Sequence, residues 1–353
     1  MQKIQPSVNK ILVVGLGSIG LRHVRNISRY FPEDEIIIFS KRKNIPKEIK
    51  NNKNIIISNS INKCLENNPN IGFITNESAF HVPTSTKLAR KGMDLFVEKP
   101  ISNSTKGIEI LQKYIKKNKL ITQMGCNFRF FPPIKKIKQL VDSNAIGRII
   151  SVQVENNSYL PDYHPCEDYR KGYAAREDLG GGAVLTQIHE IDYLYWLFGD
   201  VKKVSSFTGK FSDLDVTADD MSTSLLEFKN GIIGQVHISY FQRPYFRSCK
   251  IKGTKGIIEW ESIENNVNIF NMRTKKWKKV IINNNYKLVT GGITTGITDE
   301  RLNQMYVEEI KHFMNCVKKR KKTINDLTQG EKTLRIALAM KESSKKGKII
   351  IIK

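Results

Sequence analysis

Three glycines at a fixed spacing constrain this chain more than any other feature. Residues 10–14 read KILVV, an apolar, β-branched run that is typical of a buried strand, and Gly15, Gly17 and Gly20 follow directly. Residues 21–27 then carry apolar side chains at helical spacing. A G-x-G-x-x-G sequence between a strand and a helix predicts a dinucleotide-binding turn.

Each glycine of this turn has its own physical reason. Gly15 permits the tight turn, Gly17 lets the backbone approach a pyrophosphate, and Gly20 lets the helix pack closely on the strand. Ser18 and Ile19 begin the expected helix, where backbone N–H groups are available to an anion. A glycine-rich turn without a ligand is the alternative.

The residues after the second expected strand, 35–39, bear on the choice of cofactor. An Asp or Glu about 20 residues past the glycines would bind the ribose 2′-hydroxyl of NAD. Ser40, Lys41 and Arg42 occupy this place instead. A hydroxyl group followed by two cations suits a 2′-phosphate, so we expect NADP(H), with NAD as the second choice. A solvated basic turn is the alternative.

Strands and helices alternate over the first third of the chain. Further strands are expected at 54–58, 71–75, 94–97 and 120–126. This order predicts a doubly wound parallel sheet, in which ligands bind at the carboxyl ends of the strands. The residues expected near the cofactor at these ends are Thr75, Asn76, Glu98 and Lys99.

The pattern changes near residue 149, where strands become longer and follow one another through turns. The sequence predicts an α+β domain with a large, mainly antiparallel sheet and one helix over 182–198. Ile232, Val236 and Ile238 alternate along one strand. We expect them to form an uncovered apolar face that joins copies of the chain into a homodimer or homotetramer.

Three regions follow from this change of pattern. Residues 1–126 are expected to form the dinucleotide-binding Rossmann domain. Residues 127–325 are expected to bind substrate and mediate oligomerisation, and residues 326–353 to form a C-terminal helix and tail that packs on the first domain.

Several motifs together resemble the Gfo/Idh/MocA oxidoreductase family over nearly the whole length. They are GLGSIG, ITNESAFHVP, LFVEKPIS, GCNFRFFP and LGGGAVLTQIHEIDYLYWLFG. The resemblance implies a Rossmann domain, an open-faced sheet domain, and NAD(P)-dependent dehydrogenation of a sugar, sugar acid, cyclitol or nucleotide-sugar. Many members carry an Asp three or four residues before the histidine of the last motif. Thr186 and Leu185 stand there in this chain.

Hydride transfer at a carbinol carbon needs one group that takes or gives the hydroxyl proton. Lys99 suits this role, because burial and a cationic nicotinamide would both lower the pKa of its amine. His189, without the usual acid, is expected to orient or assist. By resemblance Glu98 contacts the nicotinamide ribose, with a structural salt bridge as the alternative. His81 matches a family position near the cofactor, with a structural role at the start of a helix as the alternative.

Residues 159–178 are dense in aromatic, His and Arg side chains and are expected to cover a substrate. Arg170 and Arg176 would suit a carboxylate or phosphate, which favours an anionic sugar-type substrate. A packed loop without ligand contacts is the alternative. The full set of expected substrate residues is Arg129, Tyr163, His164, Arg170, Tyr173, Arg176, Thr186, His189 and Tyr240.

Composition excludes several other classes of protein. The net charge of +24 is spread over all 353 residues, so we expect no nucleic-acid partner. No run of eighteen apolar residues and no apolar signal core are present, so we expect a cytoplasmic protein without a membrane partner. Five cysteines without CxxC spacing predict reduced thiols and no metal site. A non-catalytic dinucleotide-binding regulator and an NAD-assisted glycoside-cleaving relative remain as alternative functions.

Overall fold

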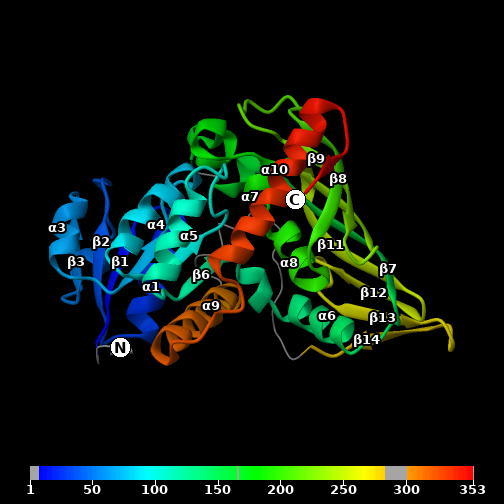
Figure 1. Ribbon diagram of the computed structural model, residues 1–353, viewed down its shortest axis with the longest axis horizontal. Coiled ribbons are helices and arrows are strands. Elements are labelled where there is room, and N and C mark those ends of the chain that lie inside the picture. Colours follow the sequence, from blue (N-terminus) through cyan, green and yellow to red (C-terminus); the bar gives the residue numbers. More distant parts are fainter. Residues whose placement is uncertain (1–7, 165–166, 283–299, 353) are drawn as a thin grey trace. The chain divides into compact units, whose positions relative to one another are not determined.

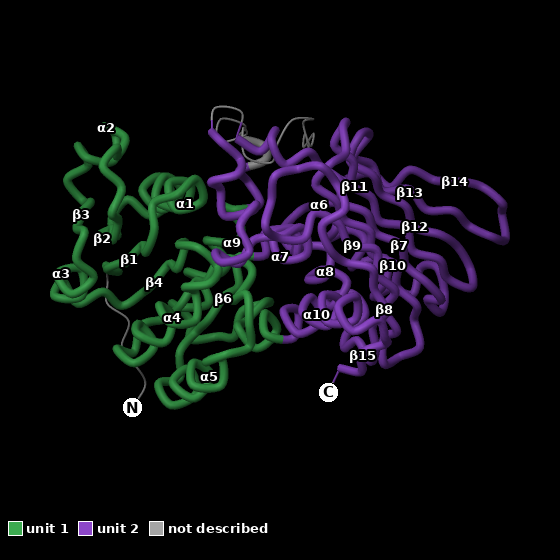
Figure 2. Tube along the Cα trace, turned by 90° about the horizontal axis from the view of Figure 1, so that it is seen from above, with its two compact units in different colours: residues 1–125, 306–331 green, residues 126–305, 332–353 purple. Residues whose placement is uncertain are grey.

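A computed structural model describes residues 8–164, 167–282 and 300–352 of the chain. The chain divides into two compact units, shown in different colours in Figure 2. The first unit comprises Met1–Gly125 and Tyr306–Glu331, and the second comprises Cys126–Met305 and Lys332–Lys353.

The first unit is built on a six-stranded sheet with the order β3-β2-β1-β4-β5-β6, in which every pair is parallel. This confirms the doubly wound sheet. Its strands are β1 (Lys10–Val14), β2 (Glu35–Phe39), β3 (Ile55–Ser58), β4 (Ile71–Ile74), β5 (Asp94–Glu98) and β6 (Thr122–Gly125). Its helices are α1 (Ser18–Tyr30), α2 (Lys47–Lys50), α3 (Ile61–Glu66), α4 (His81–Arg90), α5 (Ile108–Lys117) and α9 (Glu300–Lys319), with a 3₁₀ turn η1 (Ser78–Phe80).

The strand order reverses between β1 and β4, since the chain leaves β1 for β2 on one side and returns to β4 on the other. Such a reversal opens a crevice at the carboxyl ends of the two strands, which is where doubly wound sheets bind ligands. Leu12 and Val13 of β1 point to opposite faces of the sheet and are both fully buried, in keeping with a central strand that is covered on both faces.

The helix that completes the core of the first unit is α9. Ile310, Phe313 and Val317 from this helix join the same buried cluster as β1 and β4. Residues 306–331 group with the first unit, and residues 332–353 group with the second. The last strand, β15 (Ile350–Ile351), pairs with β8 (Val201–Gly209) of the second sheet.

The second unit contains a nine-stranded sheet, and Figure 1 shows α6 and α8 on one side of it. Only the β10–β7 pair is parallel, so the sheet is mixed and mostly antiparallel. Its order is β14-β13-β12-β11-β7-β10-β9-β8-β15. The other strands are β7 (Ile149–Tyr159), β8 (Val201–Gly209), β9 (Met221–Phe228), β10 (Ile233–Ser239), β11 (Phe241–Gly253), β12 (Gly256–Glu261), β13 (Val267–Asn271) and β14 (Lys276–Val280). The helices are α6 (Pro132–Asp142), α7 (Ala183–Thr186), α8 (His189–Phe198) and α10 (Leu327–Lys346), with short 3₁₀ turns that include η2 (Asn127–Phe130).

The apolar alternation near β10 marks the covered face of this sheet, which corrects our expectation. Ile232, Val236 and Ile238 are 7%, 0% and 0% exposed, so the chain itself covers the face on which they lie. The opposite face carries exposed apolar side chains instead: Phe207 and Leu225 on β8 and β9 are 75% and 54% exposed. β9 and β10 pair antiparallel around residues 230–231, an Asn-Gly dipeptide that is typical of a hairpin turn.

Two further expectations concern cysteines and membranes. The four cysteines within the described residues, Cys64, Cys126, Cys249 and Cys316, are buried and form no disulfide. Cys166 lies outside the described residues. Among the helices that the structure describes, none combines the length and the apolar character needed to cross a membrane.

Candidate active site

The turn between β1 and α1 has the geometry that its glycines predict. Gly15 has φ +101°, and a Cβ there would lie 2.8 Å from the backbone N of Asn76. A Cβ at Gly20 would lie 2.3 Å from the carbonyl oxygen of Gly15. Around Gly17, in contrast, no atom lies within 4 Å of a Cβ position, so this side of the turn is open.

The first turn of α1 suits an anion. Gly17 is its N-cap, no side chain caps the helix, and no acidic residue lies in its first turn. Backbone N–H groups at such a helix start point outward and attract negative charge. Ser18 and Ile19, which we expected at the cofactor, are the first two residues of this helix. The turn therefore fits a pyrophosphate without change of side chains.

Thr75 and His81 hold the ends of the strands around this turn. The Thr75 hydroxyl donates to the carbonyl oxygens of Val14 and Gly15, at 3.1 and 2.8 Å. The His81 ring lies between the carbonyl oxygens of Asn76 and Pro100, at 2.8 and 2.7 Å, and is 1% exposed. Burial lowers the pKa of His81, although both carbonyl contacts act in the other direction.

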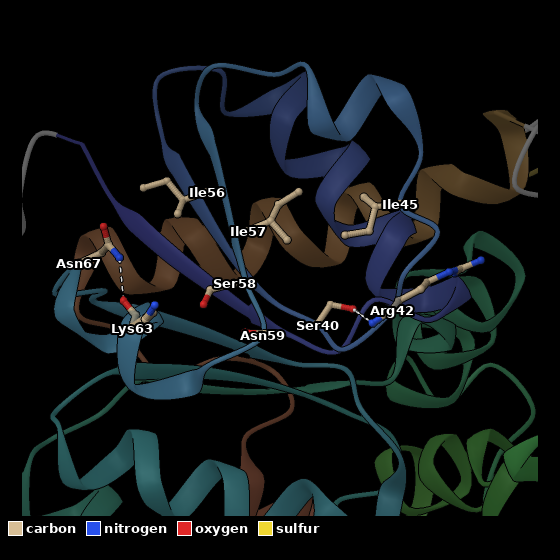
Figure 3. Close-up of a pocket in the computed structure, with 9 residues that line it drawn as sticks. All are labelled: Ser40, Arg42, Ile45, Ile56, Ile57, Ser58, Asn59, Lys63 and Asn67. Carbon is tan, nitrogen blue, oxygen red and sulfur yellow. Dashed lines mark hydrogen bonds between the residues drawn. The ribbon is translucent and has the colours of Figure 1, made fainter.

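A cavity of about 530 Å³ opens beside the carboxyl ends of β2 and β3 (Figure 3). Ser40 and Arg42 lie at one end of it, and Lys63 and Asn67 at the other. The backbone N of Arg42 donates to the Ser40 hydroxyl, and its guanidinium Nη1 donates to the carbonyl oxygen of Leu16 at 3.2 Å. Leu16 belongs to the glycine turn, so the Arg42 cation lies beside it. Lys41 is exposed and does not line the cavity.

Glu98 ends β5 and Lys99 follows it. The Glu98 side chain is buried, and its Oε1 lies 2.7 Å from Nε2 of His23 on α1. Its Oε2 accepts from the backbone N–H of Lys99 at 3.2 Å. Lys99 itself is half-buried. The first unit thus brings the glycine turn, Thr75, Asn76 and Lys99 to the same edge of one sheet.

His189 is the first residue of α8 in the second unit. The single helix expected over 182–198 is two helices, with residues 187–188 between α7 and α8. The His189 side chain is 8% exposed, and its ring centroid lies 5.0 Å from that of Phe128 on η2. Thr186, three residues earlier, ends α7 and is also buried.

Two buried ion pairs fix the start of α8. Arg129 donates from Nε and Nη2 to both carboxylate oxygens of Asp192, each at 2.8 Å. Arg247 on β11 donates from Nε to Glu190, whose other oxygen accepts from Asn156 at 3.0 Å. Arg247 also lies 3.6 Å above the Phe128 ring. Burial is the largest influence on the pKa of Arg247 and lowers it, but the charge of Glu190, its hydrogen bond and the nearby Tyr245 together raise this pKa above its usual value.

Most remaining residues that we expected at the substrate are engaged by neighbours. Tyr163 Oη lies 2.7 Å from Ser158 Oγ and accepts from Gln187 at 3.0 Å. Tyr240 is fully buried against the Tyr163 ring, and burial raises its pKa well above the usual value. Tyr173 packs against the buried apolar cluster that contains Tyr240, and His164 is half-buried.

Arg170 and Arg176 are exposed on this segment. Each guanidinium forms a two-pronged ion pair with an Asp two residues away, Asp168 and Asp178 respectively. These contacts occupy the donors that we expected to bind an anionic substrate. Pairs of this kind on an exposed surface contribute little to stability.

Several residues that shape the site carry no signal in the sequence. Asp219 accepts from the backbone of Val184 on α7 and pairs with Lys341 of α10 at 2.9 Å. Arg247 is one of 58 Lys and Arg residues, and nothing in its neighbourhood marks it as buried. Long-range pairings of this kind become visible only in the fold.

A parallel sheet with an open glycine turn, followed by a second α/β unit, defines the class of two-domain dinucleotide-binding oxidoreductases. The model of the Gfo/Idh/MocA oxidoreductase family matches the chain in two parts. Its NAD-binding Rossmann fold matches residues 9–126, and its C-terminal α/β domain matches residues 138–352. The chain therefore belongs to this oxidoreductase family.

Two relatives align over nearly the whole chain. The myo-inositol 2-dehydrogenase of Thermotoga maritima is 24% identical over 348 residues, 95% of this chain and 96% of that protein. The scyllo-inositol 2-dehydrogenase (NAD(+)) of Bacillus subtilis is 24% identical over 359 residues, 95% and 94% of the two chains.

Solved structures share the fold at low identity. Levoglucosan dehydrogenase in complex with NADH superposes with a TM-score of 0.81 and 15% identity, covering 98% of this chain and 100% of that one. The WlbA dehydrogenase of Bordetella pertussis, in complex with NADH and UDP-GlcNAcA, gives 0.80 and 18%, covering 99% of each.

Proposed function

We propose that the protein is an NADP(H)-dependent oxidoreductase that transfers a hydride to or from a hydroxyl-bearing or keto carbon of a sugar, cyclitol or nucleotide-sugar. The observation that carries this proposal is the place of Lys99. It follows β5 directly, in the same sheet whose β1–α1 turn suits a pyrophosphate. The names of the inositol dehydrogenases and of the sugar dehydrogenases with the same fold support the substrate class.

The residues of the first unit fit a dinucleotide. The N-terminus of α1 would hold the pyrophosphate, and Ser40 and Arg42 would hold a 2′-phosphate beside the glycine turn. A bound nicotinamide supplies the hydride-transfer chemistry. No acidic residue stands in the segment 40–43 to accept a ribose 2′-hydroxyl, which favours NADP(H).

Lys99 and His189 would handle the hydroxyl proton. The Nζ of Lys99 would take this proton during oxidation and return it during reduction. His189 would orient the substrate oxygen, because the position where many relatives carry an acid holds Thr186. A preference for anionic substrates would need Arg170 and Arg176 to leave Asp168 and Asp178, so it stays a weaker part of the proposal.

Fluorescence titration of the purified protein with NADP⁺ and NAD⁺ tests the cofactor choice. A charged hydrogen bond to the 2′-phosphate contributes roughly 1.5–3 kcal/mol, so NADP⁺ should bind at least about tenfold more tightly. A Ser40→Asp variant should reverse this order, because a carboxylate repels the phosphate and accepts from ribose hydroxyls. Equal affinity for both cofactors in the unmodified protein would refute the NADP(H) assignment.

A further inference from the structure

The carboxylate of Glu98 is turned into the first unit rather than away from it. Its side chain is 6% exposed, and the neighbours described above engage both oxygens: Nε2 of His23 at 2.7 Å and the backbone N–H of Lys99 at 3.2 Å. An ionised carboxylate only accepts hydrogen bonds, so the bond to it requires the His23 tautomer with its proton on Nε2. One side chain thereby joins α1 to the residue after β5.

The His23 side chain lies in an aromatic cage. It is 0% exposed, and its ring centroid lies 5.5 Å from Phe73, 5.0 Å from Phe96 and 6.4 Å from Tyr306. The guanidinium of Arg22, the preceding residue, lies 4.4 Å from the Tyr306 ring centroid. Such a low-polarity setting strengthens a hydrogen bond to a charged group and makes its loss costly.

A glycine on the next strand leaves the space that this carboxylate fills. Gly125 of β6 is the register partner of Glu98. A Cβ at Gly125 would lie 2.9 Å from the Glu98 carboxyl carbon, which is closer than real contacts allow. The position of Glu98 therefore depends on two elements, α1 through His23 and β6 through Gly125.

An apolar pair would fill this interior at lower cost than a buried His and Glu. We infer that the His23–Glu98 hydrogen bond fixes the position of Lys99 relative to the pyrophosphate-binding turn. His23 is therefore a positioning residue for the acid/base group. The inference rests on the proposed function, since it assumes that α1 and Lys99 serve one cofactor. A single hydrogen bond, between His23 and Glu98, thus links α1 to Lys99.

The test compares His23→Gln, which retains a donor at the reach of Nε2, with His23→Met, which fills similar space without one. Each full-length protein is labelled with trace acetic anhydride, with and without saturating NADP⁺, and acetylation of Lys99 is quantified by mass spectrometry. We expect NADP⁺ to reduce labelling of Lys99 about fivefold or more in the unmodified protein and in His23→Gln. In His23→Met the reduction should be less than about twofold, because a small displacement of Lys99 removes its precise fit to the bound cofactor.

Two further variants separate positioning from general damage. Ile27→Val removes a methyl group from the same helix and should leave the protection of Lys99 unchanged, as Ile27 lies in the apolar core and has no side-chain donor for Glu98. Gly125→Ala displaces Glu98 from the other side and should lose protection while His23 is intact. NADP⁺ affinity, measured by fluorescence, should stay within about threefold in all variants, because the glycine turn is untouched.

The outcomes distinguish this inference from the proposed function. Full protection in both His23→Met and Gly125→Ala overturns the inference, and so does equal loss in His23→Gln and His23→Met, which would assign the effect to packing. If His23→Met does not fold, Gly125→Ala decides alone. An unmodified protein that binds no nicotinamide cofactor, or binds it without protecting Lys99, contradicts the proposed function itself.

Discussion

Arg42 lines the cavity beside β2 and also contacts the glycine turn. Its Nη1 donates to the carbonyl oxygen of Leu16, so the cation already lies where a ribose phosphate would follow the pyrophosphate. Replacing Arg42 by Ala should weaken NADP⁺ binding by roughly 1.5–3 kcal/mol, or about 10- to 150-fold, and leave NAD⁺ binding unchanged. Isothermal titration with each cofactor measures the difference.

Lys43→Ala provides the matched control for this prediction. Lys43 is an exposed cation next to Arg42 and does not line the cavity. Its removal lowers the local positive charge by the same amount, yet should change NADP⁺ affinity only about twofold, since Lys43 does not line the cavity in which the 2′-phosphate would lie. Equal losses in both variants would mean that overall charge, and not the placement of Arg42, selects the phosphate.

At the scale of one element, the start of α8 depends on buried charge pairs. Arg247 and Glu190 are both 0% exposed, so removal of one partner leaves the other charge buried without compensation. Arg247→Met should lower the free energy of unfolding by about 3–5 kcal/mol. The double variant Arg247→Met with Glu190→Leu should recover most of this loss. Urea denaturation gives both values, and additive losses would contradict the pairing.

His81, which lies between β4 and β5, should make the free energy of unfolding depend on pH. Burial lowers the pKa of His81 in the folded protein below about 6.5, the value of an unfolded chain, so the unfolded chain binds the extra proton. The free energy of unfolding should keep its full value above pH 6.5. Below pH 6.5 it should fall by up to about 1.4 kcal/mol per pH unit.

His312 on α9 has a pKa lowered by burial as well and adds a slope of the same sign. His81→Gln should therefore reduce the slope below pH 6.5 and not abolish it, as measured by urea denaturation between pH 5.5 and about 7.5. An unchanged slope in this variant would show that His81 is protonated equally in both states.

At the scale of the whole molecule, we still predict a homodimer or homotetramer, now through the sheet face opposite to the one expected. Phe207 and Leu225 are exposed on neighbouring strands of this face, β8 and β9. Apolar groups gathered on a sheet face are typical of an interface. Light scattering should give a multiple of the 40.5 kDa chain mass. Phe207→Lys with Leu225→Lys should reduce it to the monomer, and a monomeric unmodified protein would contradict the prediction.

Local patterns in the sequence were enough to predict the parallel sheet of the first unit, but not that α9 completes its core. The glycine spacing, the β-branched runs and the alternation of strands and helices each report on neighbours within a few residues. The second unit shows the limit of such patterns. An alternating strand reports that one face is apolar, as for Val236, but not which face the helices of the same chain cover.

Long-range contacts were equally invisible in the sequence. Arg129 was expected at the substrate, yet it lies fully buried on Asp192, 63 residues later. β15 lies in a run of four isoleucines, residues 349–352, but nothing in this run indicates that it pairs with a strand that begins at Val201. The bond between His23 and Glu98 joins residues 75 positions apart. In each case the fold, and not the spacing along the chain, brings the two partners into contact.

The most direct measurement of the central claim is turnover of a polyol and sugar panel with NADP⁺, followed by the absorbance of the reduced nicotinamide. General acid–base catalysis contributes roughly 10²–10⁴-fold, so Lys99→Met should lose at least about 10² in kcat on any substrate that the unmodified enzyme oxidises, while it still binds NADP⁺. His189→Ala should lose less in kcat and raise KM more. A Lys99→Met enzyme that turns over normally beside an inactive His189→Ala enzyme would contradict the account.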